Sequence, residues 1–197
     1  MNDKVDHAIY KDFLDDKKII INETIDDSSV SRVTMMIKKW NIQDDREEME
    51  TMCSHCSVSS FDRTKDPIKI YINSPGGCYT SSMSIVSAIL ASKTPVETYV
   101  IGEASSGAFL IAIAGHKRYA QRFARLMFHN GTTKVSGEVT LLNSTVDEIN
   151  RSMLEMFNYV VERTNLKMKE LREKTQGKDW YFTAAEAKAV GIIDEVE

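Results

Sequence analysis

The sequence predicts an α/β domain with a largely parallel β-sheet, and two of its patterns indicate this fold class. Short apolar runs typical of buried strands, such as residues 68–74 (IKIYINS), recur along the chain. Between them lie segments in which apolar residues return every three or four positions, as amphipathic helices require. Repeated alternation of this kind is typical of βαβ units, whose functional sites lie at the carboxyl ends of the strands.

The first predicted strand covers residues 19–21, and a helix follows it. Asp26, Asp27 and Ser28 can cap the beginning of this helix. One apolar stripe then runs along it, formed by Val30, Val33, Ile37 and Trp40. Residues 41–66 are polar and charged with few core candidates, so we expect a surface insertion made of a helix end and a loop.

The middle of the chain is predicted to hold three further strands and two helices. The strands cover residues 67–74, 95–104 and 125–130, and the helices cover residues 78–93 and 105–120. The second helix is rich in small residues, so we expect it to pack closely against its neighbours.

The longest helix is predicted over residues 138–164, where one apolar face continues for many turns. A subunit of this size has limited room to bury such a face, so we expect a partner helix from a neighbouring subunit. A short helix near residues 185–190 and a terminal strand near Ile192 and Ile193 complete the chain.

Length and composition are those of one globular domain over residues 1–197. The chain is 42% hydrophobic and 27% charged, and its net charge of -4 offers no basic surface for nucleic acid. Its first residues have no apolar core of the kind that a signal peptide needs, and no stretch reaches the length of a membrane span. Three cysteines, an odd number, argue against a disulfide framework. We therefore expect a cytoplasmic protein with reduced thiols, no nucleic-acid partner and no membrane partner.

Ser106 is the candidate nucleophile. It lies where a predicted strand turns into a predicted helix, so free backbone N–H groups would surround its hydroxyl. Such a place suits a nucleophile whose reaction builds an oxyanion. A serine at this position is more often a helix cap, and Ser105 competes for both roles.

His129 is the best-placed of the four histidines to act as a base, because it follows the strand that contains residues 125–128. Asp179 precedes three aromatic residues, and partial burial there would let its carboxylate orient an imidazole. Each residue taken alone also fits a structural role.

Gly76 and Gly77 form a strand-to-helix turn without side chains, through which a backbone N–H could approach a reacting carbonyl. A tight turn or a phosphate-binding loop would use the same pattern. No Lys-Ser or Lys-Thr pair follows the glycines, so nucleotide binding of the P-loop kind is not expected.

Four motifs in order, YINSPGG, IGEASSGAFLIAIAG, MFHN and DWYFTAAEAKAVGIID, resemble the ClpP family, the proteolytic subunit of the Clp protease. The resemblance runs from about residue 9 to the end, apart from the insertion. It implies a ClpP/crotonase-like fold with a protruding handle helix and a serine peptidase that needs no cofactor or metal. It assigns Ser106 as nucleophile, His129 as base, Asp179 as the residue that orients it, and the N–H groups of Gly77 and Gly107 as the oxyanion hole. The spacings from Gly77 and to Gly115 match the family without a gap when Ser106 is the nucleophile.

The resemblance also implies an assembly. Residues 132–164 match the handle region, a strand at 132–139 followed by the helix that interdigitates between two stacked heptameric rings in ClpP-like proteins. Such a tetradecamer encloses a chamber in which unfolded proteins or peptides are cut. The family contacts an AAA+ unfoldase through a longer N-terminal loop than the arm of residues 1–8 here, so coupling to an unfoldase is left open.

Two cysteine features have no counterpart in the motifs. Cys53, His55 and Cys56 lie in the insertion and could supply three zinc ligands, but a fourth ligand and a second pair are missing from the pattern, so no metal site is expected. Cys78 adjoins Gly77 and is expected to line the pocket as a small residue.

Two other function classes stay open at this point. A ring subunit or scaffold with weak or no hydrolysis would keep the fold, and the short arm and the altered turn at Gly107 favour it. A crotonase-like acyl-CoA enzyme would use glycine N–H groups in a related fold, but it would not need the order Ser, His, Asp. The sequence leaves open whether the protein is a bacterial paralogue or a phage protease.

Overall fold

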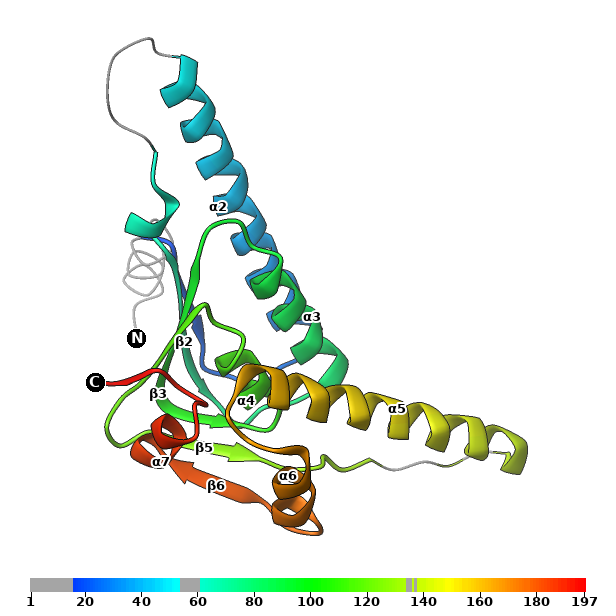
Figure 1. The fold of residues 1–197 in the computed structure, drawn as a ribbon. Helices are drawn as coiled ribbons and strands as arrows, with labels where there is room; N and C mark the ends of the chain where they lie inside the picture. The colour runs from blue at the N-terminus through cyan, green and yellow to red at the C-terminus, as the bar shows by residue number, and fades with distance from the viewer. Residues whose placement is uncertain (1–15, 54–60, 134–135, 137) are drawn as a thin grey trace, which may run out of the picture.

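Seven strands form one mixed sheet in the computed structural model, which describes residues 16–53, 61–133, 136 and 138–197 (Figure 1). In chain order these strands are β1 (Lys18–Ile21), β2 (Ile68–Ser74), β3 (Val96–Ser105), β4 (Lys117–Ala120), β5 (Arg125–Phe128), β6 (Trp180–Thr183) and β7 (Glu195–Val196). The main path is β1-β2-β3-β4-β7, and all of its pairings are parallel. The α/β fold class with a largely parallel sheet is thus confirmed.

One edge of strand β3 pairs with two different strands. Residues 97–100 pair with β4, and residues 103–105 pair in parallel with β5, which in turn pairs antiparallel with β6. The carboxyl end of β3 therefore lies beside the carboxyl end of β5. This split brings the segment after Ser105 next to the segment after Phe128.

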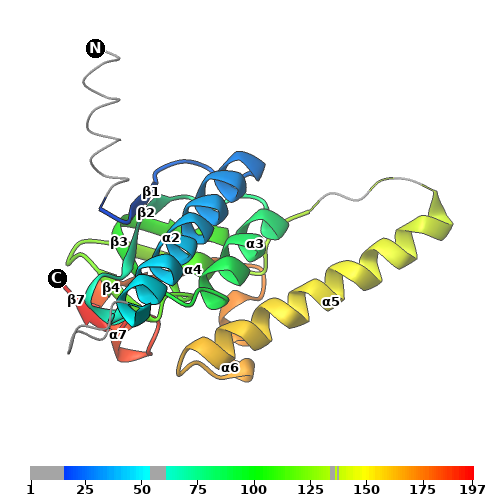
Figure 2. The same cartoon turned by 90° about the horizontal axis from the view of Figure 1, so that it is seen from above.

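Six α-helices surround the sheet in the described part of the chain. They are α2 (Asp27–Cys53), α3 (Tyr79–Leu90), α4 (Gly107–Ala112), α5 (Val139–Arg163), α6 (Met168–Thr175) and α7 (Ala184–Ala189), with a short 3-10 helix at Arg63–Lys65. Helices α2 and α3 run side by side, and α5 projects far from the body of the molecule (Figures 1 and 2). No helix within these described ranges combines the length and the apolarity needed to cross a membrane.

The long predicted helices are confirmed, and α2 is longer than its apolar stripe indicated. Helix α2 continues through the first half of the expected insertion to Cys53. One residue of that half, Asp44, is fully buried and forms an ion pair with Lys17 at 2.7 Å. Although residues 41–66 are mostly polar, they therefore include one member of a buried ion pair. This ion pair links α2 to the residue that precedes β1.

Two predicted boundaries are wrong. The small-residue helix ends at Ala112 rather than Ala120, and residues 117–120 form strand β4, whose hydrogen bonds come from distant residues of β3 and β7. The terminal strand is β7, not Ile192 and Ile193, which are buried in the preceding turn with their N–H groups bonded to Ala187. The apolar residues Ile192 and Ile193 thus indicate burial, but they do not indicate that the backbone forms a strand.

The expected handle strand is absent from the described positions of residues 132–139. Thr132, Thr133, Ser136 and Glu138 lie outside any strand, and residues 134, 135 and 137 are outside the described ranges. A strand needs a neighbour for its backbone hydrogen bonds, and the described part of this chain offers none there.

Candidate active site

Ser106 lies at a sharp turn between β3 and α4. Its backbone angles, φ 54° and ψ −120°, are unusual for a residue with a side chain, and among the described non-glycine residues only Lys17 shares a positive φ. Such a conformation costs about 1–3 kcal/mol and is common at functional sites. The Ser106 N–H continues the sheet by donating to the carbonyl of Met127 at 2.9 Å. The strained turn is thus held by the β3–β5 pairing, and it exposes the hydroxyl at the end of the sheet.

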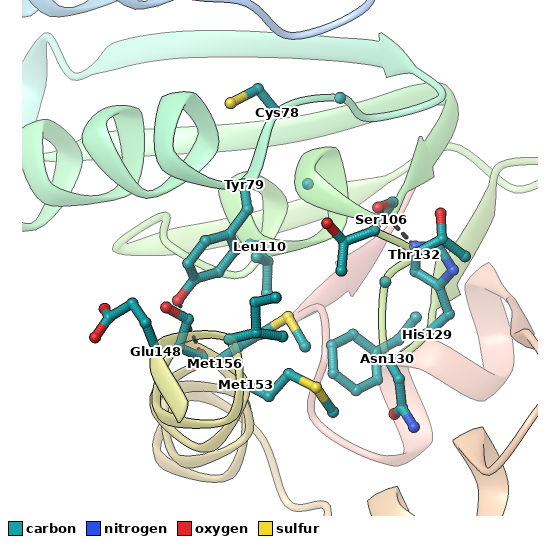
Figure 3. Close-up of a pocket in the computed structure, with 17 residues that line it drawn as sticks. Cys78, Tyr79, Ser106, Leu110, His129, Asn130, Thr132, Glu148, Met153 and Met156 are labelled. Atoms are coloured by element: carbon teal, nitrogen blue, oxygen red, sulfur yellow. Dashed lines mark hydrogen bonds between the residues drawn. The ribbon is translucent and has the colours of Figure 1, made fainter. Parts of the chain in front are cut away.

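The structure brings the three predicted side chains close together, and Figure 3 shows the contact between Ser106 and His129. The Ser106 Oγ lies 2.8 Å from Nε2 of His129, which follows β5. The Nδ1 atom of the same ring lies 3.3 Å from Oδ1 of Asp179, which precedes β6. A carboxylate only accepts hydrogen bonds, so Asp179 favours the tautomer with the proton on Nδ1, and in that tautomer Nε2 can accept from the serine hydroxyl.

Ser105 has different surroundings. Its side chain is 3% exposed, and its hydroxyl donates to the carboxylate of Glu103 at 2.5 Å. The two adjacent serines therefore point to different sides of the strand end, as alternation along a strand requires. Only Ser106 contacts His129 in this structure.

Close backbone packing around Ser106 explains why three nearby positions, Gly76, Gly77 and Gly107, are glycines. Gly76 has φ 93°, and a Cβ there would collide with the carbonyl of Ser105. A Cβ on Gly77 would collide with the backbone of Ile25, to which this turn is joined by a short parallel bridge. A Cβ on Gly107 would meet the hydroxyl of Ser82 and would lie 3.5 Å from the nitrogen of Gly77. The absence of side chains lets the Gly77 turn and the beginning of α4 approach each other closely.

This approach gathers backbone donors beside the serine. The bridge to Ile25 uses the carbonyl of Gly76 and the N–H of Cys78, so the N–H of Gly77 stays outside it. Gly107 is the first residue of α4, where N–H groups have no partner within the helix. The two N–H groups can therefore stabilise negative charge on an oxygen that lies next to Ser106.

The serine opens into a pocket of about 500 Å³ (Figure 3). Its walls come from the glycine turn, the beginning of α3 and α4, the segment after His129 and one face of α5. Apolar and polar side chains both line it, and the large apolar ones are Tyr79, Leu110, Phe128, Ile149, Met153 and Met156. The pocket therefore suits an apolar side chain next to a polar reacting group.

Cys78 lines the same pocket, as the sequence predicted, and its thiol is exposed. Hydrogen bonds from Ser81 and then Thr80 lower the pKa of the Cys78 thiol to about 7. The Sγ atom lies 3.1 Å from the hydroxyl of Thr80. A substantial fraction of this thiol is therefore ionised at neutral pH.

Several residues of the pocket escaped the sequence interpretation. Met153 and Met156 were assigned to the apolar face of a long helix, and Tyr79 to the beginning of another, without a role in the site. Asn130 follows His129 and forms a hydrogen bond with Thr175 of α6. No local sequence pattern predicts this bond. Their contacts depend on how α3, α5 and α6 meet, and a sequence pattern does not report this.

Within the described ranges no three His, Cys, Asp or Glu side chains gather as metal ligands. The prediction for Cys53, His55 and Cys56 lies outside the described side chains, so it stays a prediction.

In a comparison with protein-family models, residues 41–197 match the family described as Clp protease. The match begins inside α2 and includes every segment that builds the pocket and the serine turn.

Proposed function

Because the chain belongs to the Clp protease family, we propose that it is a serine endopeptidase in which Ser106, His129 and Asp179 form the catalytic triad. The family supports peptidase activity, peptide substrates and oligomeric assembly in general terms. The assignment of roles to individual residues is our proposal. The single observation that carries it is that His129 lies 2.8 Å from the Ser106 hydroxyl through Nε2 and 3.3 Å from the Asp179 carboxylate through Nδ1.

In the proposed reaction the Ser106 hydroxyl attacks the carbonyl carbon of the scissile peptide bond. His129 takes the hydroxyl proton at Nε2, and Asp179 holds the ring in the required tautomer and stabilises its positive charge. The oxyanion of the tetrahedral intermediate receives hydrogen bonds from Gly77 and Gly107. His129 then gives its proton to the leaving amine, and a water molecule hydrolyses the acyl-enzyme by the reverse sequence.

Assembly is the second part of the proposal. Helix α5 leaves the body of the subunit, and its apolar residues Val146 and Leu154 are each 46% exposed. Packing of this helix against a second subunit would remove that surface from water. Two stacked heptameric rings are expected from the sequence resemblance, and contact with an AAA+ unfoldase stays open. A cytoplasmic location is a separate part of the proposal.

The test is intact-mass analysis after treatment with a fluorophosphonate, with oligomer size recorded on the same samples. We expect one adduct per subunit in the wild type and in Ser105→Ala, and no adduct in Ser106→Ala. An adduct that persists in Ser106→Ala would contradict the assignment of the nucleophile. No adduct on a properly assembled ring would favour the inactive scaffold instead.

A second measurement distinguishes the proposed peptidase from the alternative of an acyl-CoA enzyme. An acyl-CoA enzyme would bind immobilised CoA and would not require the histidine–serine pair. We expect no CoA binding and a loss of peptide hydrolysis in His129→Ala.

A further inference from the structure

The hydroxyl of Tyr79 joins the catalytic turn to the long helix. Tyr79 is the first residue of α3 and lies two residues after Gly77. Its hydroxyl donates to the backbone carbonyl of Ser152 in α5 at 3.1 Å (Figure 3). A carbonyl oxygen accepts two hydrogen bonds, so this contact adds to the helical bond of Ser152. Burial and then the charge of Glu155 raise the pKa of Tyr79, which keeps the phenol protonated as a donor.

The bond meets α5 at the point where the helix leaves the body. Every side chain of residues 143–148 is exposed. Among the described side chains of α5, from residue 142 onward, the buried ones begin one turn after Ser152, at Met156 and Phe157, and continue with Tyr159 and Val160. Tyr79 therefore contacts α5 near the place where the helix leaves the body of the subunit.

The inner half of α5 has strong anchors of its own. Tyr159 donates to the carbonyl of Leu110 at 3.1 Å, and Arg163 donates to the carbonyls of Ile113 and Gly115 at 2.9 and 2.7 Å. These bonds satisfy carbonyls at and just after the end of α4, and their donors, Tyr159 and Arg163, do not line the pocket. Loss of the Tyr79 bond would leave them in place.

The contact between Tyr79 and α5 also forms one wall of the pocket. Ile149, Ser152 and Met153 line it from α5, and the ring of Tyr79 lines it from α3. Their spacings of three and four residues place them on one face of the helix. Any outward movement of α5 about its inner anchors would widen the pocket between these two walls.

We propose that Tyr79 is a positioning residue that holds the α5 wall against the catalytic pocket through the carbonyl of Ser152. It thereby sets the affinity for a bulky apolar side chain placed next to the scissile bond. The kinetic part of this inference rests on the proposed peptidase function, whereas its structural part does not.

The structural part is tested by hydrogen exchange of the assembled protein, read by mass spectrometry. Tyr79→Phe keeps the ring and removes only the donor. We expect faster exchange in residues 143–153 and unchanged exchange in α4. The matched control is Tyr99→Phe, which removes a hydroxyl bonded to Glu97 at 2.6 Å in the middle of the sheet. Equal exchange of α5 in the wild type and Tyr79→Phe would overturn the proposal.

The kinetic part uses two peptides that differ only in the residue before the scissile bond, leucine or alanine. We expect Tyr79→Phe to raise KM for the leucine peptide about three- to tenfold, as the loss of one hydrogen bond predicts, with kcat nearly unchanged. The alanine peptide fills less of the pocket and should respond less. An equal loss of kcat on both peptides, with KM unchanged, would overturn the positioning role. An absence of turnover in the wild type would instead contradict the proposed function, and the exchange experiment needs no activity.

Discussion

The buried hydroxyl of Thr175 lies within hydrogen-bonding distance of the side-chain amide of Asn130, the residue that follows His129. Thr175 is 1% exposed and ends α6, four residues before Asp179. Its hydroxyl also lies 2.7 Å from the carbonyl of Leu171. A hydroxyl has one proton, and Thr175 shares it between the Oδ1 atom of Asn130 and the carbonyl of Leu171. The contact with Asn130 joins the two segments that carry the histidine and the aspartate.

We therefore expect Thr175→Val to lower kcat several-fold with little change in KM. The substitution keeps the shape of the side chain but leaves Asn130 without its partner, which should also lower the free energy of unfolding by about 1–3 kcal/mol. Peptide kinetics and urea unfolding measure the two effects. Thr164→Val is the control, because Thr164 makes a similar bond to the carbonyl of Val160 at 2.7 Å. A kcat that changes equally in both variants would argue against a specific effect on the His129–Asp179 pair.

The close packing around Gly107 and Gly77 predicts that a second substitution will restore activity in the Gly107 variant but not in the Gly77 variant. Gly107→Ala should reduce kcat because the new Cβ would meet the hydroxyl of Ser82. The double variant Ser82→Ala/Gly107→Ala should recover part of this loss, because the obstructing atom belongs to a side chain. Gly77→Ala meets the backbone of Ile25 instead, so it should lose about a hundredfold in kcat, and no side-chain substitution should restore it. Equal kcat in Gly107→Ala with and without Ser82→Ala would show that the obstruction lies elsewhere.

The thiol of Cys78 should react at neutral pH. Its pKa is lowered to about 7, so the thiolate predominates above that pH and alkylation should reach half of its maximal rate there. Ser81→Ala removes the strongest stabilising hydrogen bond and should move this midpoint to higher pH. The rate of iodoacetamide labelling, followed by mass spectrometry in the Ser106→Ala background, measures both. A wild-type midpoint near the ordinary cysteine value of about 8.5 would contradict the prediction.

The buried pair of Lys17 and Asp44 should contribute strongly to stability. Asp44 also accepts a hydrogen bond from Thr94 at 2.5 Å, so both of its oxygens are occupied. Asp44→Asn leaves Lys17 largely buried without its main partner, and we expect a loss of about 3–5 kcal/mol in the free energy of unfolding. Glu195→Gln, which breaks the exposed pair with Lys117, should change the free energy of unfolding far less in the same urea experiment, because solvent screens this pair. Similar losses in the two variants would refute the prediction.

The same pair predicts a pH dependence. Burial alone would lower the pKa of Lys17, but hydrogen bonds to Asp44 and Asp66, together with their charges, outweigh it and raise the pKa above the ordinary value. The stabilisation is therefore complete below about pH 10.4, the unfolded value, and is lost as pH rises through the folded pKa. Urea unfolding between neutral and strongly alkaline pH should show this loss in the wild type and a smaller one in Lys17→Met.

Local patterns predicted the long elements because their signal repeats within the element. Helix α5 covers Val139–Arg163 against an expected 138–164, since its apolar residues keep a three-four rhythm throughout. The short strands β4 and β7 gave no such signal. Tyr119 of β4 pairs with Tyr99 and Glu195, so the strand exists only when three distant segments meet. Helix α6, which carries Thr175, went unpredicted for a similar reason, because it is short and mostly polar.

The candidate site shows the same division between local and distant information. Residue types and motif order named Ser106, His129, Asp179, Gly77 and Gly107 and placed them at strand ends, because each motif is a continuous stretch. Only the tertiary structure decided that β3 pairs with β5 at its carboxyl half, so that Ser106 rather than Ser105 lies against His129. It also decided that Tyr79 bonds Ser152 and that Asn130 bonds Thr175. The physical reason is range: backbone periodicity and turn chemistry act over a few residues, whereas these contacts join residues that are 45 and 73 positions apart in the chain.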